Sequence, residues 1–444
     1  MPDLLQLTIE AKRNLRYNEP LDPNSELFVN LNAARGDFNE NRLRWDLGIA
    51  GDELDTQQPN QYFMFGGHRG CGKSTELKRL AEELHKPQWY FVIFIDALAE
   101  LDVNSLRYSD ILLAQAKVLI TKLETEKIEL DQVYLTRLEQ WFKKRIESNQ
   151  DTRTLAAQIQ AGAKAKHGIP FLAELFVSLT SSVQTNSTYK TEIRNVVRNT
   201  FSEFSAAFND LIHHVEDVLA AQNKGKKILF IVDGTDRLRS EDSQRFFVDD
   251  VYQLKQIESN FIYCTPVDLL SEQGALRQEF SLSRLPMVKL YEKHGIEPLP
   301  VALDAMKKLI SRRMDEALFD SPETMEYLIR YSGGHVRDLI RLLNYCLAET
   351  EGTRHITQTV ADSAIHVLAT EYRRLIEQDD YPLLVEIDTK DKEYTPMGEQ
   401  TRRLLYNLIL LEYNSFWWQS HPVVQTLDAY KTEKEKLESS RTDA

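Results

Sequence analysis

The hydrophobic positions of this chain fall into short apolar runs separated by longer amphipathic stretches. Five runs have the length of a strand: QYFMFGG at 61–67, WYFVIFIDA at 89–97, KKILFIVDGTD at 226–236, NFIYCTP at 260–266 and PMVKLYE at 286–292. The runs are largely apolar throughout, which is typical of strands that are buried on both faces. Helical segments separate them, so the pattern predicts an α/β fold with a parallel sheet covered by helices.

Helical periodicity accounts for the segments between the runs. The segment at 74–86 follows the first predicted strand and has a single apolar face, made of Leu77, Leu80, Ala81 and Leu84. A charged and mostly helical segment at 102–225 interrupts the sheet before its third strand. Within it, residues 161–184 form either an apolar surface for a partner or a membrane, or a helical hairpin packed on the core. The packed hairpin is the favoured interpretation.

The C-terminal part predicts helices followed by a β-hairpin. The helical pattern GEQTRRLLYNL leads into LILLEYNSFWWQSHPVV, which has the composition of two strands with a turn near Asn414–Ser415. Helices followed by a hairpin suggest a winged-helix module. Trp417 and Trp418 are adjacent, so in a strand they would face opposite sides, one inward and one towards a partner or the rest of the chain.

Length and composition limit the class of protein. With 444 residues the chain exceeds one ordinary core, and two or three domains are expected. A hydrophobic content of 42% and a charged content of 27% indicate a folded globular chain. The net charge of −14 disfavours nonspecific attraction to nucleic acid, although it does not exclude a local basic patch.

The cysteine pattern and the apolar segments predict a cytoplasmic protein. Cys71, Cys264 and Cys346 lie far apart without metal-ligand spacing, as expected for a reduced chain. The first residues lack the basic and apolar regions of a signal peptide. The longest apolar runs, such as 89–95, are too short to span a bilayer.

The stretch GHRGCGKST at 67–75 carries the clearest chemistry. Its spacing, Gly67-x4-Gly72-Lys73-Ser74, matches the phosphate-binding P-loop and stands between a predicted strand and a predicted helix. Gly67, Gly70 and Gly72 would let backbone N–H groups converge on phosphate oxygens at the positive end of the helix. Lys73 would reach the β- and γ-phosphates, and Ser74 would ligate Mg²⁺.

Two further loop residues belong to the predicted nucleotide contacts. Thr75 is expected just beyond the phosphates, towards the base. Cys71 is either a reactive thiol, because helix N-termini stabilise thiolates, or simply a small residue that suits a tight loop. The second interpretation is favoured.

The run ILFIVDGTD at 228–236 has the pattern of a Walker B strand. Asp233 would hold Mg²⁺ beside Ser74. Many ATPases have a second acid directly afterwards, but here that position is Gly234. Asp236 either polarises the attacking water or caps the turn before the next helix, and both interpretations stay open. Together the motifs predict a P-loop NTPase that uses Mg²⁺, and the lack of a guanine-recognition motif favours ATP.

These motifs, with FIYCTP at 261–266 and SGGHVRDLIRLL at 332–343, resemble those of the AAA+-related STAND ATPases and of origin-recognition-type replication initiators. The resemblance covers roughly residues 25–350 and is weak outside the motifs. It implies a helical lid over the nucleotide and an attached C-terminal winged helix. It also implies a setting in prokaryotic signalling or anti-phage defence, beside a separate effector.

The resemblance further implies residues that sense the γ-phosphate. Thr265 matches the sensor at the end of the fourth strand, and the alternative is a hydroxyl that caps the turn before Pro266. Arg337 follows two glycines and matches the arginine sensor of the lid, the alternative being an exposed lid arginine. Arg277 and Arg284 lie where an arginine finger for a neighbouring subunit could sit, but surface arginines are favoured there.

The predicted domain organisation follows from these assignments. The parts are N-terminal lead-in helices at 1–60, a P-loop ATPase core at 61–300 with a helical insert at about 102–225, a helical lid at 301–355, a winged-helix-like module at 356–431 and a charged, frayed tail at 432–444.

Three functions fit the sequence. The favoured one is an ATP-binding and ATP-hydrolysing regulatory switch that signals to a protein partner or effector, with self-association left open. The alternative is a DNA-binding replication or transposition ATPase, against which the acidic balance and the absence of Lys and Arg from the hairpin count. A third is a scaffold that binds nucleotide but barely hydrolyses it, because Gly234 replaces the second acid.

Overall fold

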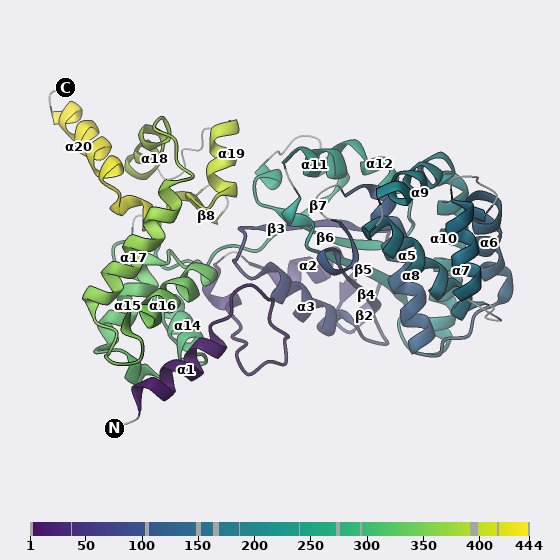
Figure 1. Cartoon of the computed structure of the whole chain (residues 1–444), viewed down its shortest axis with the longest axis horizontal. Helices are drawn as coiled ribbons and strands as arrows, with labels where there is room; N and C mark the ends of the chain where they lie inside the picture. Colours follow the sequence, from purple (N-terminus) through teal and green to yellow (C-terminus); the bar gives the residue numbers. More distant parts are fainter. Residues whose placement is uncertain are drawn as a thin grey trace.

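A five-stranded parallel sheet lies at the centre of the fold (Figure 1). The computed structural model describes residues 3–36, 38–102, 106–147, 152–162, 168–185, 187–238, 240–271, 276–293, 295–390, 398–414 and 417–442. The strands of the sheet are β3 (Tyr62–Gly67), β4 (Tyr90–Asp96), β5 (Lys227–Asp233), β6 (Asn260–Pro266) and β7 (Ser281–Arg284). Their spatial order is β4-β5-β6-β3-β7, so β3, which leads into the phosphate loop, has a parallel neighbour on each side.

Successive side chains of each strand enter two different hydrophobic cores. In β3, Tyr62 and Met64 join the core beneath the helical insert, whereas Phe63 and Phe65 join a second core against α3 (Lys73–Leu84). A strand turns successive residues to opposite faces, so both faces of this sheet are buried. The predicted α/β fold with a parallel sheet covered by helices is confirmed.

The fifth strand is not the one that the sequence predicted. β7 pairs with β3 through residues Ser281–Arg284, whereas 286–292 joins no strand of the sheet in the part of the chain that the structure describes. Pro286 has no N–H to donate to a ladder, which disfavours a paired strand there. The apolar pattern of 286–292 instead reflects burial, with Val288 and Leu290 in the core of the lid.

The insert between β4 and β5 is helical, as predicted, and lies at one end of the molecule (Figure 1, right). Its main helices are α5 (Tyr108–Thr125), α6 (Gln132–Phe142), α7 (Arg153–Gly162), α8 (Ile169–Thr185), α9 (Ser187–Asn199) and α10 (Phe201–Ala221). Leu172, Phe176 and Leu179 of α8 are fully buried in the core shared with the sheet. The packed interpretation is therefore confirmed for α8, while residues 163–167 of the predicted hairpin lie outside the described residues.

The lid lies on the opposite side of the sheet from the insert (Figure 1). Its helices are α14 (Pro300–Ser311), α15 (Pro322–Tyr331), α16 (Val336–Thr350) and α17 (Gln358–Arg373). They share one core with Ala11 and Leu15 at the end of α1 (Leu4–Asn14). The N-terminal lead-in therefore packs on the lid, and it also contains α2 (Glu40–Asp46) and an unpredicted hairpin of β1 (Ile49–Ala50) and β2 (Glu53–Leu54).

The C-terminal module contains the predicted hairpin. It comprises α18 (Asp380–Thr389), α19 (Glu399–Tyr406), the antiparallel strands β8 (Leu410–Asn414) and β9 (Trp417–Ser420), and α20 (Asp428–Thr442). The turn at 415–416 lies outside the described residues. Trp417 packs in the core against the sheet and Trp418 in the core of the lid, so they do face opposite sides. The prediction of a frayed tail from residue 432 is wrong up to Thr442, because α20 continues to that residue.

Short helices complete the connections between strands. They are α4 (Ala97–Glu100), α11 (Ser240–Gln244), α12 (Val251–Leu254) and α13 (Leu276–Glu279). Across the described ranges, no helix combines the length and apolar character needed to cross a bilayer.

Candidate nucleotide site

The phosphate loop runs from the end of β3 to the start of α3. Gly70 and Gly72 have backbone φ values of 88° and 106°, which residues other than glycine rarely adopt. A β-carbon on Gly70 would lie 2.8 Å from Nε2 of His335, and one on Gly67 would lie 2.6 Å from the carbonyl oxygen of Leu285. The glycines of the motif are therefore required both by the backbone and by the close approach of neighbouring segments.

Lys73 is buried at the first position of α3. Its Nζ donates to the carbonyl oxygens of Gly67 at 2.8 Å and His68 at 3.0 Å, and it forms an ion pair of 2.8 Å with Asp236. Burial is the largest single effect and lowers the pKa of Lys73, but the charge of Asp236 and the hydrogen bond to it, together with contributions from Cys71 and Cys264, raise the pKa overall. The side chain is thus a fixed cation inside the loop.

Ser74 and Asp233 meet across the ends of α3 and β5. Ser74 Oγ donates to Asp233 Oδ1 at 3.0 Å. The pKa of Asp233 is raised, first by burial and then by the nearby charge of Asp236. A hydroxyl and a desolvated carboxylate side by side are the oxygen ligands that Mg²⁺ prefers, and a cation there would offset the repulsion between the two acids.

The structure thus brings the glycine loop and its buried lysine together with the acidic residues at the end of β5, which is separated from β3 by β6. The chain has a P-loop NTPase fold. The sequence predicted both halves of this P-loop site, because each half is a continuous motif.

Asp236 lies in a 3₁₀ turn, Thr235–Arg237, directly after β5. Burial is the largest single effect and raises its pKa, but the ion pair with Lys73 and the charges of Arg69 and Arg237 together lower the pKa. Its carboxylate therefore stays ionised and faces the loop. Because Lys73 engages this carboxylate, Asp236 could act on a water molecule only after Lys73 releases it, and both interpretations of Asp236 stay predictions.

Thr265 sits on β6 opposite Gly66 of β3. Its side chain is fully buried, and its Oγ1 has no hydrogen-bond partner among the described residues. A β-carbon on Gly66 would lie 3.0 Å from this oxygen. Buried hydroxyls are normally satisfied, so an unpartnered one beside the phosphate loop suits a ligand better than the predicted turn-capping alternative.

Arg337 lies in the first turn of α16, against Gly70 of the loop. The pKa of Arg337 is lowered, first by burial and then by the positive charges of Arg237 and Arg69. All three arginines line the cleft that also contains Lys73, Ser74 and Asp236. Such a gathering of cations is unfavourable by itself and would be relieved by an anion. Arg69 and Arg237 were not predicted, although Arg69 lies within the phosphate-loop motif and Arg237 directly follows the motif that ends at Asp236.

The N-terminal segment covers the outer side of the loop. The hydroxyl of Thr75 accepts a hydrogen bond from the backbone N–H of Leu21 at 3.2 Å, and residues 16–21 line the cleft. The cleft encloses about 120 Å³, whereas sites for small molecules typically have about 300–1,000 Å³. A nucleotide therefore needs this segment or the lid to move. No sequence motif marks residues 16–21.

Cys71 is a packing residue of the loop. Its side chain is only 1% exposed, which excludes an accessible thiol and bears out the favoured interpretation. Its carbonyl oxygen accepts a hydrogen bond of 2.7 Å from the buried guanidinium of Arg35, a residue that no sequence motif marks.

The C-terminal module touches the loop directly. His68 Nε2 accepts a hydrogen bond of 2.8 Å from the backbone N–H of Glu412 in β8. The Glu412 carboxylate pairs with Arg284 of β7, so Arg284 is engaged within the chain. Arg69 donates to the hydroxyl of Tyr406 in α19 at 3.2 Å and stacks over its ring. The contacts of His68 and Arg69 join segments that lie 344 and 337 residues apart, which no local pattern could predict.

Comparison with known proteins gives structural matches of low similarity. No protein-family model matches the sequence, and no curated protein matches it. Cdc6p from Pyrobaculum aerophilum is 11% identical with a TM-score of 0.35, covering 92% of this chain and 99% of its own. The Aeropyrum pernix Orc1 protein, in complex with DNA, is 12% identical with a TM-score of 0.35, covering 94% and 95%. TM-scores this low do not support a fold assignment. The assignment depends on the strand order of the sheet and on the phosphate loop.

Proposed function

We propose that the chain is an ATP-binding regulatory switch that hydrolyses ATP and passes its nucleotide state to a protein partner. The observation that carries the proposal is the meeting of three parts of the chain at residues 68–70. The lid approaches there through His335 and Arg337, and the C-terminal module through Glu412 and Tyr406. A loop built for phosphates that also contacts the lid and the C-terminal module suits a switch better than a static scaffold.

The residues of the site would divide the work as follows. Lys73 would hold the β- and γ-phosphates, and Ser74 and Asp233 would hold Mg²⁺, which neutralises phosphate charge when bound. Thr265 and Arg337 would contact the γ-phosphate from the sheet and from the lid. The unpartnered hydroxyl, the crowded arginines and the left-handed glycines all support this fit.

Hydrolysis would depend on an exchange of partners at Lys73. Its ammonium group is now paired with Asp236 at 2.8 Å. Once phosphate oxygens engage Lys73, the carboxylate of Asp236 is free to orient a water molecule. Gly234 cannot supply that acid, so we assign the role to Asp236 and expect turnover to be slow.

The DNA-reading alternative gains no support from the geometry. Arg403 of α19 pairs with the fully buried Asp380 and with Glu377, so its charge is used within the chain. Glu412, Trp417 and Trp418 of the hairpin are all buried against the lid or the sheet. A wing that faces its own chain suits an internal signal. The partner class, self-association, a cytoplasmic setting and anti-phage defence stay predictions from the sequence.

ATP turnover by purified protein tests the proposal. We expect slow phosphate release by the wild type, its loss in Lys73→Ala, and a reduction of at least about tenfold in Asp236→Ala. Lys78→Ala, on the same helix, is the matched control and should keep wild-type turnover. Turnover that survives in Asp236→Ala would remove Asp236 from the mechanism. No turnover in any variant, with binding intact, would favour the scaffold.

A further inference from the structure

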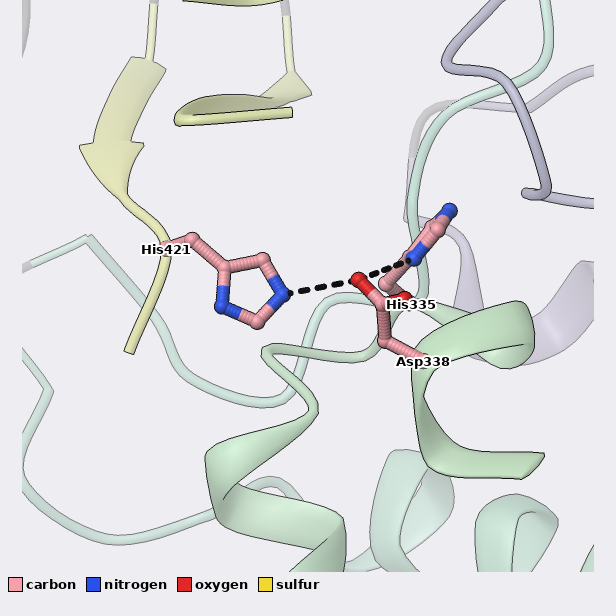
Figure 2. Close-up of side chains that lie close together, drawn as sticks. All are labelled: His335, Asp338 and His421. Atoms are coloured by element: carbon pink, nitrogen blue, oxygen red, sulfur yellow. Dashed lines mark ion pairs between the residues drawn. The ribbon is translucent and has the colours of Figure 1, made fainter. Parts of the chain in front are cut away.

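A fully buried polar cluster joins the lid to the C-terminal module. His335 precedes α16, Asp338 lies in its first turn, and His421 follows β9 (Figure 2). Asp338 Oδ2 lies 2.9 Å from Nδ1 of His335 and 3.2 Å from Nε2 of His421, and none of the three side chains is exposed. Sequence spacing could not predict this cluster, because His421 is 83 residues from Asp338.

Two more donors complete the surroundings of Asp338. The hydroxyl of Tyr372 in α17 donates to Oδ2, and the guanidinium of Arg341 donates to Oδ1 at 2.9 Å. Burial would raise the pKa of Asp338, but the imidazoles of His335 and His421 hold it well below its usual range. One ionised carboxylate therefore ties together α16, α17 and the chain after β9.

The cluster is arranged to hold protons and not a metal ion. Nδ1 of His421 accepts a hydrogen bond of 3.2 Å from the backbone N–H of Val423, which assigns the ring proton to Nε2, the nitrogen that lies 3.2 Å from Asp338. The other carboxylate oxygen is taken by the cation Arg341. A divalent cation would have to displace the proton and lie beside that positive charge.

The cluster reaches the phosphate loop through His335. Its second nitrogen, Nε2, lies 2.7 Å from the carbonyl oxygen of Arg69. The phosphate loop packs tightly against His335 here, since a β-carbon on Gly70 would lie 2.8 Å from the same nitrogen. A continuous polar path thus runs from Arg69 through His335 and Asp338 to His421.

We propose that this path is the relay by which the phosphate loop controls docking of the C-terminal module, with His335, Asp338 and His421 as positioning residues. The inference rests on the proposed function. Phosphate draws Arg69 and Arg337 towards itself, the carbonyl of Arg69 leaves His335, and the imidazole loses the support that aims it at Asp338. The contact between Asp338 and His421 then weakens, and Arg69 also leaves Tyr406, so the module loosens.

The coupling between nucleotide binding and docking of the C-terminal module must act in both directions. If bound nucleotide loosens the module, then loosening the module must tighten nucleotide binding by the same factor. His421→Leu removes the imidazole that lies beside Asp338 at similar volume and should tighten binding of a fluorescent ATP analogue about five- to tenfold. His421→Gln keeps a donor and should return towards the wild type. A residue with only a packing role would leave affinity unchanged or weaken it.

Asp388→Asn is the matched control. Asp388 is a buried carboxylate of the same module, but it accepts hydrogen bonds from Ser420, Gln425 and Tyr430 inside the module. Its affinity for nucleotide should stay within about twofold of the wild type. Hydrogen exchange of the amides in β8 and β9 gives the second readout, and nucleotide should accelerate it in the wild type and much less in His421→Leu.

The outcomes separate the two proposals. If the wild type binds no nucleotide, the proposed function fails, and the relay with it. If the wild type binds but His421→Leu has unchanged or weaker affinity, the relay is wrong and the nucleotide site stands. Elemental analysis that finds about one metal ion per chain, lost in His421→Leu, would overturn the assignment of protons to this cluster.

Discussion

At the level of single residues, substitution of Thr265 should lower ATP turnover without lowering the stability of the fold. Its hydroxyl is buried without a partner among the described residues, and an unsatisfied buried group costs roughly 1–3 kcal/mol. Thr265→Val keeps the shape, so the free energy of unfolding should stay equal or rise by about 1 kcal/mol. ATP turnover should nevertheless fall about 10- to 100-fold, because a bond to the γ-phosphate is lost.

Thr235→Val is the control for this substitution. Its hydroxyl is equally buried but donates to the carbonyl oxygen of Cys264. Urea denaturation should show a loss of about 1 kcal/mol for Thr235→Val and none for Thr265→Val. Wild-type turnover in Thr265→Val would limit that residue to packing.

His68 makes stability depend on pH. Burial, with the nearby charges of His335 and Lys73, lowers the pKa of His68 to about 3. The unfolded chain binds this proton near pH 6.5 and the folded chain does not, so stability falls as the pH drops from about 6.5 to about 3. The loss from this group is about 1.4 kcal/mol per pH unit. His68→Gln should remove that contribution in urea denaturation at pH 7, 6 and 5, and equal slopes for both proteins would contradict it.

At the scale of elements, the start of α16 fixes the position of Arg337. Gly334 has φ +76°, and a β-carbon there would lie 2.0 Å from the carbonyl oxygen of Val288. Gly334→Ala should therefore cost roughly 2–5 kcal/mol and weaken nucleotide binding, because the helix must shift away from the loop. Gly51 has φ +63°, but a β-carbon there would meet no atom of the described residues within 4 Å, so Gly51→Ala should cost only about 1–2 kcal/mol and spare binding. Equal losses in both variants would show that strain alone decides the effect.

The elements that the sequence predicted are those with a local pattern. β3 to β6 are continuous apolar runs, and the loop and Asp233 are continuous motifs, so each could be recognised alone. β7 could not, because Ser281–Arg284 is a half-buried edge strand without an apolar run. The contacts of Arg69, His335 and Glu412 depend on how distant segments pack, and their residue types alone carry no signal of it.

At the scale of the whole molecule, the ion pair of Arg284 and Glu412 fastens the hairpin to the sheet. Glu412 is buried and Arg284 is 24% exposed. Burial raises the pKa of Glu412, and the charge of Arg284 opposes that rise. Arg284→Met should cost about 2–4 kcal/mol, because it leaves a buried carboxylate without its partner. Arg284→Met combined with Glu412→Gln should recover most of this in chemical denaturation, and no recovery would mean that the pair is not coupled.

Binding of ATP at the P-loop can be measured by calorimetry of the full chain with ATP and Mg²⁺. We expect one ATP per chain, an affinity at least about 100-fold weaker in Lys73→Ala, and wild-type binding in Lys78→Ala. A wild-type chain that shows no binding, or a Lys73→Ala chain that binds as tightly as the wild type, would contradict this prediction.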